Sequence, residues 1–209
     1  MSESQVTLDA HQAFAEPSPF GIPSKKLAIW LFIASDSITF GAILFGYAYL
    51  RSGTANWPTP FHFSPSIVNG MVMTAVLLTS SLTMLGAVEA AKRGDKSSAL
   101  KWLGATILLG IVFATLHIRE WFHMFGEGWS LLKNPEGGSV LFGASFFSIT
   151  GLHLMHVISG VIALIVIAIG YKTDWLDQVH VETTGLYWHF VDLVWMFVFP
   201  LVYLMNASR

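Results

Sequence analysis

The sequence predicts an all-α membrane protein, a bundle of five transmembrane helices, and three observations lead to this fold class. Hydrophobic residues make up 54% of the 209-residue chain and charged residues only 11%, whereas charged residues are about 25% of an ordinary soluble domain. The charges lie between long apolar stretches. The alternating segments of a membrane β-barrel are absent from the sequence. The composition disfavours a soluble enzyme, and a net charge of −2 gives no basic surface for nucleic acid.

The chain is expected to begin with a polar tail over residues 1–26, followed by one transmembrane domain over residues 27–206. The tail contains acids and prolines but no basic segment of the kind that opens a signal peptide. The first span is expected at about 27–50. Asp36 is its only charged residue.

Four further stretches are long enough to cross a hydrocarbon core, which needs about 20 apolar residues. Asp192 is the only charge in the last of them, and linkers rich in proline, glycine or charge separate the stretches. Because backbone groups in lipid must be satisfied within their own segment, each stretch is predicted to be a helix. These spans are expected at about 66–88, 102–123, 139–171 and 185–206.

The distribution of Lys and Arg predicts the orientation, since cytoplasmic segments carry an excess of both. The bias favours a cytoplasmic N-terminus and a periplasmic C-terminus. The segments on the side of the N-terminus contain Lys25, Lys26, Lys92, Arg93, Lys96, Lys101 and Lys172. Those on the other side contain only Arg51, Arg119, Lys133 and Arg209.

Asp36 is the first candidate functional residue, because a charge inside a membrane is costly and is retained for a reason. It follows Lys26 by ten residues, which places it about 15 Å deep in a helix. Two interpretations stay open: a carboxyl that exchanges protons, and a neutral acid that is hydrogen-bonded between helices.

Histidines and acids three residues apart share a helix face. Such pairs serve as metal ligands, as a proton relay or as structural hydrogen bonds, and the structural role is the commonest. We interpret one group as a mainly structural polar cluster between the fourth and fifth helices. Its members are His153, His156, His189 and Asp192.

A haem between His117 and His153 is disfavoured, because residue counts place these side chains at depths of about 12 Å and 21 Å. Glu120 and His123 match one half of a di-iron site, but a second half is missing from the sequence. The chain has no cysteine. No metal site is therefore expected in this chain.

Short motifs in the spans resemble those of one known family. The segment from Tyr187 to Trp195, YWHFVDLVW, resembles the last-helix signature of subunit III of haem-copper oxidases. The segment from Thr150 to Gly160, TGLHLMHVISG, and the segment from Trp30 to Asp36, WLFIASD, are also similar to segments of this family. The motifs occur in the family's order over nearly the whole chain, and five spans match its short bacterial form.

The resemblance implies an accessory subunit of a respiratory oxidase in the bacterial inner membrane, where the complex reduces O₂ to water and translocates protons. It implies contacts with subunit I above all, with subunit II and with a small subunit IV. Haem and copper would lie in those partners, with no redox centre in this chain and with phospholipid bound to it. Asp36 would support proton uptake. The candidate lipid or interface residues are Glu120, Glu182 and Trp188.

Three other interpretations are open from the sequence. A membrane cytochrome b anchor would show a haem spectrum in the isolated chain. A transporter would have broken helices or inverted repeats, which the sequence lacks. The equivalent subunit of a nitric oxide reductase stays within the same family. The sequence leaves open whether cytochrome c or quinol is the electron donor.

Overall fold

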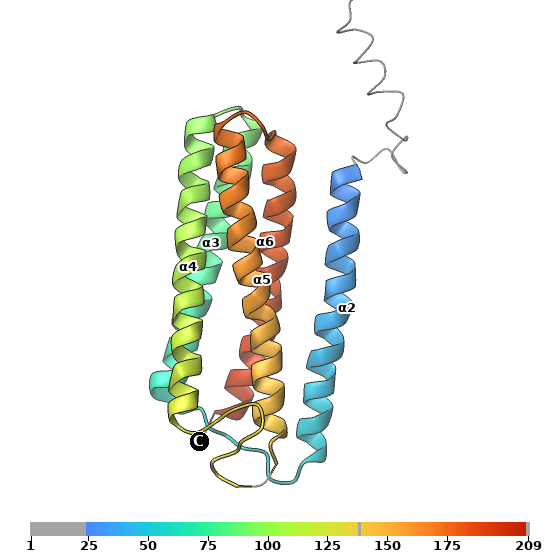
Figure 1. Cartoon of the computed structure of the whole chain (residues 1–209), viewed down its shortest axis with the longest axis vertical. Coiled ribbons are helices and arrows are strands. Elements are labelled where there is room, and N and C mark those ends of the chain that lie inside the picture. Colours follow the sequence, from blue (N-terminus) through green and yellow to red (C-terminus); the bar gives the residue numbers. More distant parts are fainter. Residues whose placement is uncertain (1–23, 138, 208–209) are drawn as a thin grey trace, which may run out of the picture.

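Five long helices form the fold in the computed structural model, which describes residues 24–137 and 139–207 (Figure 1). Each is long and apolar enough to cross a membrane. The prediction of an all-α chain with five spans is thus confirmed for the described residues. The helices are α2 (Ser24–Gly53), α3 (Val68–Lys92), α4 (Lys96–Gly126), α5 (Leu141–Lys172) and α6 (Gln178–Val198). Three short helical segments complete the described part of the chain: η2 (Phe63–Ile67), η3 (Phe199–Tyr203) and η4 (Leu204–Asn206).

The predicted N-terminal tail lies mostly outside the described residues. Its last part, from Ser24 onward, already belongs to α2. The final helix also begins earlier than the expected span, at Gln178. Asp177 explains this start, because its side chain accepts hydrogen bonds from the backbone N–H groups of Val179 and His180 and caps the helix.

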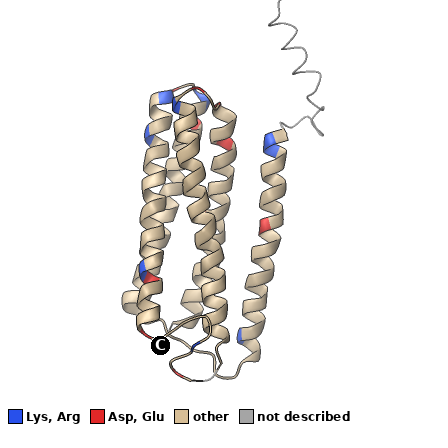
Figure 2. Cartoon of the chain, viewed as in Figure 1, with Lys and Arg blue, Asp and Glu red and all other residues tan. Residues whose placement is uncertain are grey.

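Helices α3, α4, α5 and α6 pack around a common core, and α2 lies on one side, mainly against α5 and α6 (Figure 1). We call the end of the bundle where α2 begins the amino end and the opposite end the carboxyl end. The chain leaves the last helical segment at the carboxyl end, as an odd number of spans requires. Charged residues gather mainly toward the two ends of the bundle (Figure 2).

Trp188 forms a central packing contact between α6 and its two neighbours. A Cβ on Gly110 of α4 would lie 2.7 Å from the Trp188 ring, and one on Gly160 of α5 would lie 2.9 Å from it. Only glycine leaves room for the indole at these two positions. The Trp188 Nε1–H donates to Ser80 Oγ at 3.1 Å. The side chain is 1% exposed, so the expectation that Trp188 contacts lipid or a partner is wrong.

Candidate functional site

An ion pair or hydrogen bond joins Asp36 of α2 to His156 of α5. The Asp36 Oδ2 and His156 Nε2 atoms are 3.0 Å apart, and the two side chains are 19% and 16% exposed. The other ring nitrogen, Nδ1, lies 2.8 Å from the carbonyl oxygen of Leu152, one turn earlier on α5. Helix α5 therefore fixes the imidazole on one side while α2 presents the carboxyl on the other.

The Leu152 carbonyl determines how the pair can hold protons. A carbonyl oxygen only accepts, so Nδ1 must carry a hydrogen and donate it. At zero net charge, one further proton then lies between Nε2 and the Asp36 carboxyl. It belongs either to a carboxylic acid that donates to a neutral imidazole or to an imidazolium that donates to a carboxylate. Both forms satisfy the hydrogen bond, which is what a carboxyl at this depth requires.

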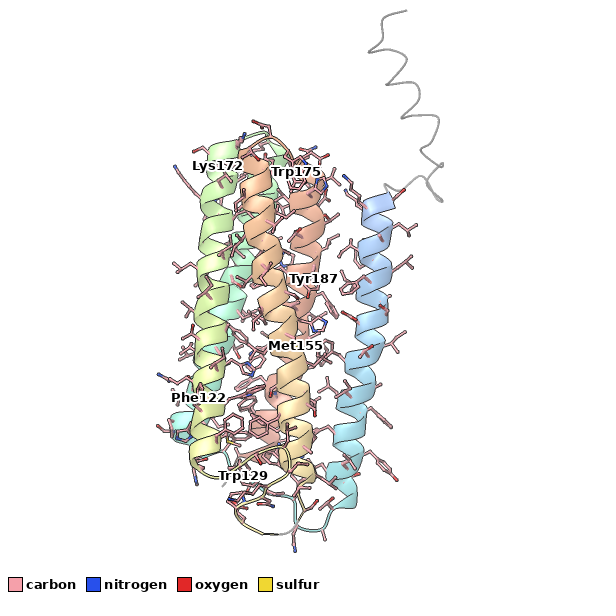
Figure 3. The ribbon with its side chains drawn as sticks, in the orientation of Figure 1. Phe122, Trp129, Met155, Lys172, Trp175 and Tyr187 are labelled. Atoms are coloured by element: carbon pink, nitrogen blue, oxygen red, sulfur yellow. The ribbon has the colours of Figure 1, made fainter. Side chains whose placement is uncertain are left out.

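Tyr187 and Ser159 lie next to this pair. The Tyr187 hydroxyl is 2.9 Å from Ser159 Oγ and donates to the carbonyl oxygen of His156 at 3.2 Å. The Tyr187 side chain lies on the part of α6 that faces α2 (Figure 3), where its ring centroid is 5.8 Å from that of Phe32. The pair therefore has a polar edge formed by α5 and α6.

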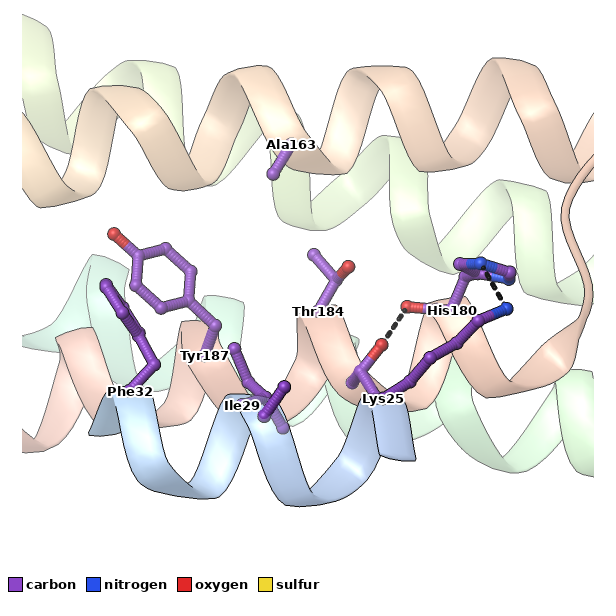
Figure 4. A pocket seen from close by; sticks show the side chains of 9 residues that line it. Lys25, Ile29, Phe32, Ala163, His180, Thr184 and Tyr187 are labelled. Carbon is purple, nitrogen blue, oxygen red and sulfur yellow. Dashed lines mark hydrogen bonds between the residues drawn. The ribbon is translucent and has the colours of Figure 1, made fainter. Parts of the chain in front are cut away.

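A groove of about 560 Å³ runs along α2 on the same side of the bundle. Phe32 and Tyr187 line one end of the groove, and Lys25 and His180 line the other (Figure 4). The Lys25 Nζ and His180 Nε2 atoms are 3.0 Å apart. The groove thus joins a cationic mouth at the amino end to a mostly apolar wall that ends beside the Asp36–His156 pair.

The polar cluster expected between the fourth and fifth helices is divided in the structure. Within the described residues no hydrogen bond joins any two of its four members. His156 turns toward α2, whereas His153 is fully buried and its ring stacks on Trp195 with centroids 5.2 Å apart. Residues three apart on a helix differ by about 60° in direction, and this angle is enough to put them on different sides of α5.

The other two members of the expected cluster lie on α6. His189 Nδ1 is 2.6 Å from Ser81 Oγ of α3. Asp192 is 6% exposed, and its Oδ1 has no hydrogen-bond partner among the described protein atoms. The histidine thus pairs with a serine of another helix instead of with a member of the cluster.

His117 and His153 lie side by side, with ring centroids 6.5 Å apart. The expected difference in depth between them is therefore wrong. The residue count assumed that α4 and α5 end at the same height, and helices in a bundle need not do so. The described residues contain no group of three or more His, Cys, Asp or Glu side chains placed to hold a metal ion.

The two acids expected at a lipid or partner contact differ in exposure. Glu120 is 6% exposed, and its Oε2 accepts a hydrogen bond from Asn69 Nδ2 at 2.7 Å inside the bundle. Glu182 lies near the amino end and forms salt bridges with Lys26 at 2.9 Å and with Lys92 at 3.5 Å. Only Glu182, at 25% side-chain exposure, remains accessible.

The sequence interpretation missed the partners of these residues. Leu152, Ser81, Asn69 and Lys25 carry no sequence signal of their own. Their importance depends on which helix faces meet, and one sequence does not reveal this.

Comparison with known proteins gives a consistent result over most of the chain. The family model described as cytochrome c oxidase subunit III matches residues 20–207. The chain is 34% identical over 189 residues to cytochrome c oxidase subunit 3 of Alkalihalophilus pseudofirmus, covering 88% of each chain. It is 35% identical over 181 residues to cytochrome bo(3) ubiquinol oxidase subunit 3 of Pseudomonas aeruginosa, covering 85% of this chain and 83% of the relative. It is 31% identical over 209 residues to cytochrome c oxidase subunit 3 of Bacillus subtilis, covering 98% and 97%.

Proposed function

Because the chain belongs to the cytochrome c oxidase subunit III family and is an accessory subunit of a haem-copper oxidase, we propose that its Asp36–His156 pair supports proton uptake by that complex. Family membership sets aside the cytochrome b anchor and the transporter. Similar relatives are named for both cytochrome c and quinol oxidases, so the electron donor is left open.

The 3.0 Å contact between Asp36 Oδ2 and His156 Nε2 is the observation that carries this proposal. His156 Nδ1 is committed to the Leu152 carbonyl, so only the Nε2 side of the ring can exchange a proton with Asp36. Both side chains keep partial exposure, and Tyr187, which lines the α2 groove, donates to the carbonyl oxygen of His156. A carboxyl in this setting can take up a proton and pass it on without leaving a bare charge in lipid.

The partners and the membrane that we propose for this subunit are those of its family. The subunit would pack mainly against subunit I, with further contacts to subunit II and a small subunit IV, in a bacterial inner membrane. Haem and copper would lie in those partners. On α2, large apolar side chains are exposed and form a surface that either lipid or a partner helix could cover. Examples are Phe45 and Tyr49, which are 75% and 71% exposed.

Bound phospholipid is the second part of the proposal, and the α2 groove supports it. The Lys25 ammonium at the mouth would attract a phosphate group, and the apolar wall from Ala28 to Phe32 would hold an acyl chain. Replacing Lys25 with Ala is expected to reduce the phospholipid that copurifies with the complex, as measured by native mass spectrometry. Replacing Lys101, exposed on α4 away from the groove, is the matched control. Equal lipid retention in both variants would remove this part of the proposal.

The test of the proton role is an Asp36→Asn substitution in the assembled oxidase. Asparagine keeps the shape and a hydrogen bond to His156 but cannot exchange a proton. We expect normal assembly, with slowed proton uptake and an altered dependence of turnover on pH. Ser35→Ala, at the neighbouring exposed position, is the control. If the Asp36→Asn complex matched the native rates and proton pumping at every pH, the proposal would be wrong.

A further inference from the structure

Four polar side chains come together inside the bundle toward its carboxyl end, away from α2. His117 and Glu120 belong to α4, His153 to α5 and Tyr203 to η3. Three of them are fully buried, and Glu120 is 6% exposed. We call this group the buried histidine cluster. It lies apart from the Asp36–His156 pair, and the inference below does not depend on the proposed proton role.

The Trp195 ring is the common neighbour of the cluster. Its centroid is 5.5 Å from that of His117, 5.2 Å from that of His153 and 5.9 Å from that of Tyr203. Glu120 lies close enough to Tyr203 for the two side chains to interact electrostatically. The polar atoms of four side chains are therefore brought into one region by three helical elements.

Most polar atoms in this region have no protein partner. Both ring nitrogens of His117, both ring nitrogens of His153, Glu120 Oε1 and the Tyr203 hydroxyl make no hydrogen bond to the described protein atoms. Buried polar atoms are almost always hydrogen-bonded, because leaving them unpaired costs the full desolvation of the group. Six unpaired atoms on four buried side chains in one region point to a ligand.

We propose that the buried histidine cluster binds ordered water. The orphan atoms include both donors and acceptors, since a neutral imidazole has one of each and a phenol can act as either. Water can donate to some of these atoms and accept from others, and buried water typically has two to four polar partners. A metal ion would serve only the acceptors, and its charge would lack sufficient ligands in this region.

A polar route leads from the cluster to the surface of α4. Glu120 Oε2 accepts from Asn69 Nδ2 at 2.7 Å. Asn69 Oδ1 accepts from Arg119 Nη2 at 3.2 Å, and Arg119 is exposed. This chain of contacts extends the polar region from the cluster toward the surface of α4.

X-ray radiolysis of the assembled oxidase tests the proposal, because radicals formed from bound water label side chains that bulk solvent does not reach. We expect labelling of Trp195 and Tyr203, although both are fully buried. Met84 is the control, since it is also fully buried, has an easily oxidised sulfur and lies outside the cluster. If Trp195 and Tyr203 were as unlabelled as Met84, the water site would be disproved.

A double variant, His117→Phe with His153→Phe, removes four of the six orphan atoms and keeps flat rings. Labelling of Trp195 and Tyr203 is expected to fall to the level of Met84. The control is Phe113→Leu, which alters packing against both histidines but removes no polar atom, and it should keep the labelling. Unchanged labelling in the double variant would overturn the proposal.

A high-resolution structure of the native complex decides the question independently, even if the double variant does not assemble. We expect solvent density within about 3 Å of the His117 and His153 nitrogens. Direct pairing of these nitrogens with protein groups would count against the proposal. So would a metal ion identified by its anomalous scattering.

Discussion

At the scale of single residues, His156 shows how one backbone contact defines the chemistry of a side chain. Its Nδ1 is held by the Leu152 carbonyl at 2.8 Å, which leaves Nε2 as the one nitrogen available to Asp36. The ring therefore cannot turn to another partner without breaking a hydrogen bond. Asp36 and His156 should act as one unit, because in the described structure each is the other's hydrogen-bonding side chain and the second partner of His156 is a backbone carbonyl.

A double-mutant cycle is expected to show this coupling. Asp36→Asn and His156→Gln should each change the pH dependence of oxidase turnover. The double variant should be no worse than either single one, because both substitutions remove the same shared proton. The measurement is proton uptake per electron in reconstituted oxidase. Ser159→Ala combined with Asp36→Asn is the reference pair, and additive losses for Asp36 and His156 would contradict the shared site.

Asp36 and its partner differ in how far the sequence can reveal them. Asp36 is visible because it is the only charge in its span, and its depth follows from a residue count. His156 was grouped with His153 because a three-residue spacing suggests a common face. Because the two side chains differ in direction, His156 instead contacts Asp36 of α2 and His153 stacks on Trp195. Position along a helix is readable from the sequence, whereas the facing partner depends on packing.

At the scale of elements, two glycines of α4 look alike in the sequence but differ in whether packing requires them. A Cβ on Gly110 would lie 2.7 Å from Trp188 and 2.8 Å from Val161, whereas one on Gly104 would meet nothing within 4 Å. The first glycine permits α4, α5 and α6 to enclose the indole. The second makes no packing contact that requires glycine.

Gly110→Ala is expected to destabilise the subunit by about 1–3 kcal/mol, the usual range for overpacking a filled core. Gly104→Ala should be neutral or slightly stabilising, since alanine favours the helix over glycine by up to about 1 kcal/mol. Thermal unfolding of the two variants in the same detergent compares them directly. Equal melting temperatures would show that α4 shifts freely to relieve the contact.

The turn between α3 and α4 depends on two residues that act locally, a glycine in the turn and an acid that caps the next helix. Gly94 has a φ of +75°, which glycine adopts without strain, and Asp95 caps α4 by accepting from the Ser98 backbone N–H at 3.0 Å. This hydrogen bond holds the pKa of the Asp95 carboxyl below its ordinary value. Turn and cap residues of this kind can be inferred from the sequence, because they interact with residues only a few positions away in the chain.

The Asp95 cap should weaken only in acid. A carboxyl whose folded pKa is lowered contributes its full stabilisation above the ordinary value of 3.8 and loses it as the pH falls through the lowered pKa. Hydrogen exchange of the Ser98 and Ala99 amides should therefore accelerate below that range relative to their intrinsic rates. Asp95→Asn, a cap without a charge, should remove the acid-dependent increase. If the exchange still accelerated in acid in the Asp95→Asn variant, a group other than Asp95 would be responsible.

At the scale of the whole molecule, α2 is attached to the bundle differently from the other helices. It packs mainly on α5 and α6, and polar contacts hold it at three heights. Lys26 pairs with Glu182 at the amino end, Asp36 pairs with His156 in the middle, and the Asn206 side chain donates to the Tyr47 hydroxyl at the carboxyl end. The number of spans followed from the sequence, but this side-by-side placement of the first and last spans depends on contacts far apart in the chain.

The chain suits a cysteine-labelling test of its orientation in the membrane, because its sequence contains no cysteine. Trp175 at the amino end is 76% exposed, and Leu132 at the carboxyl end is 84% exposed, so a cysteine at either position should be reachable. The excess of Lys and Arg at the amino end predicts that this end faces the cytoplasm. A membrane-impermeant maleimide should then label Leu132→Cys in intact spheroplasts and Trp175→Cys only after permeabilisation. The reverse labelling pattern would show the opposite orientation, with the Lys25 mouth of the groove on the periplasmic side. Proton uptake from the cytoplasm through Asp36 would then lose its structural basis.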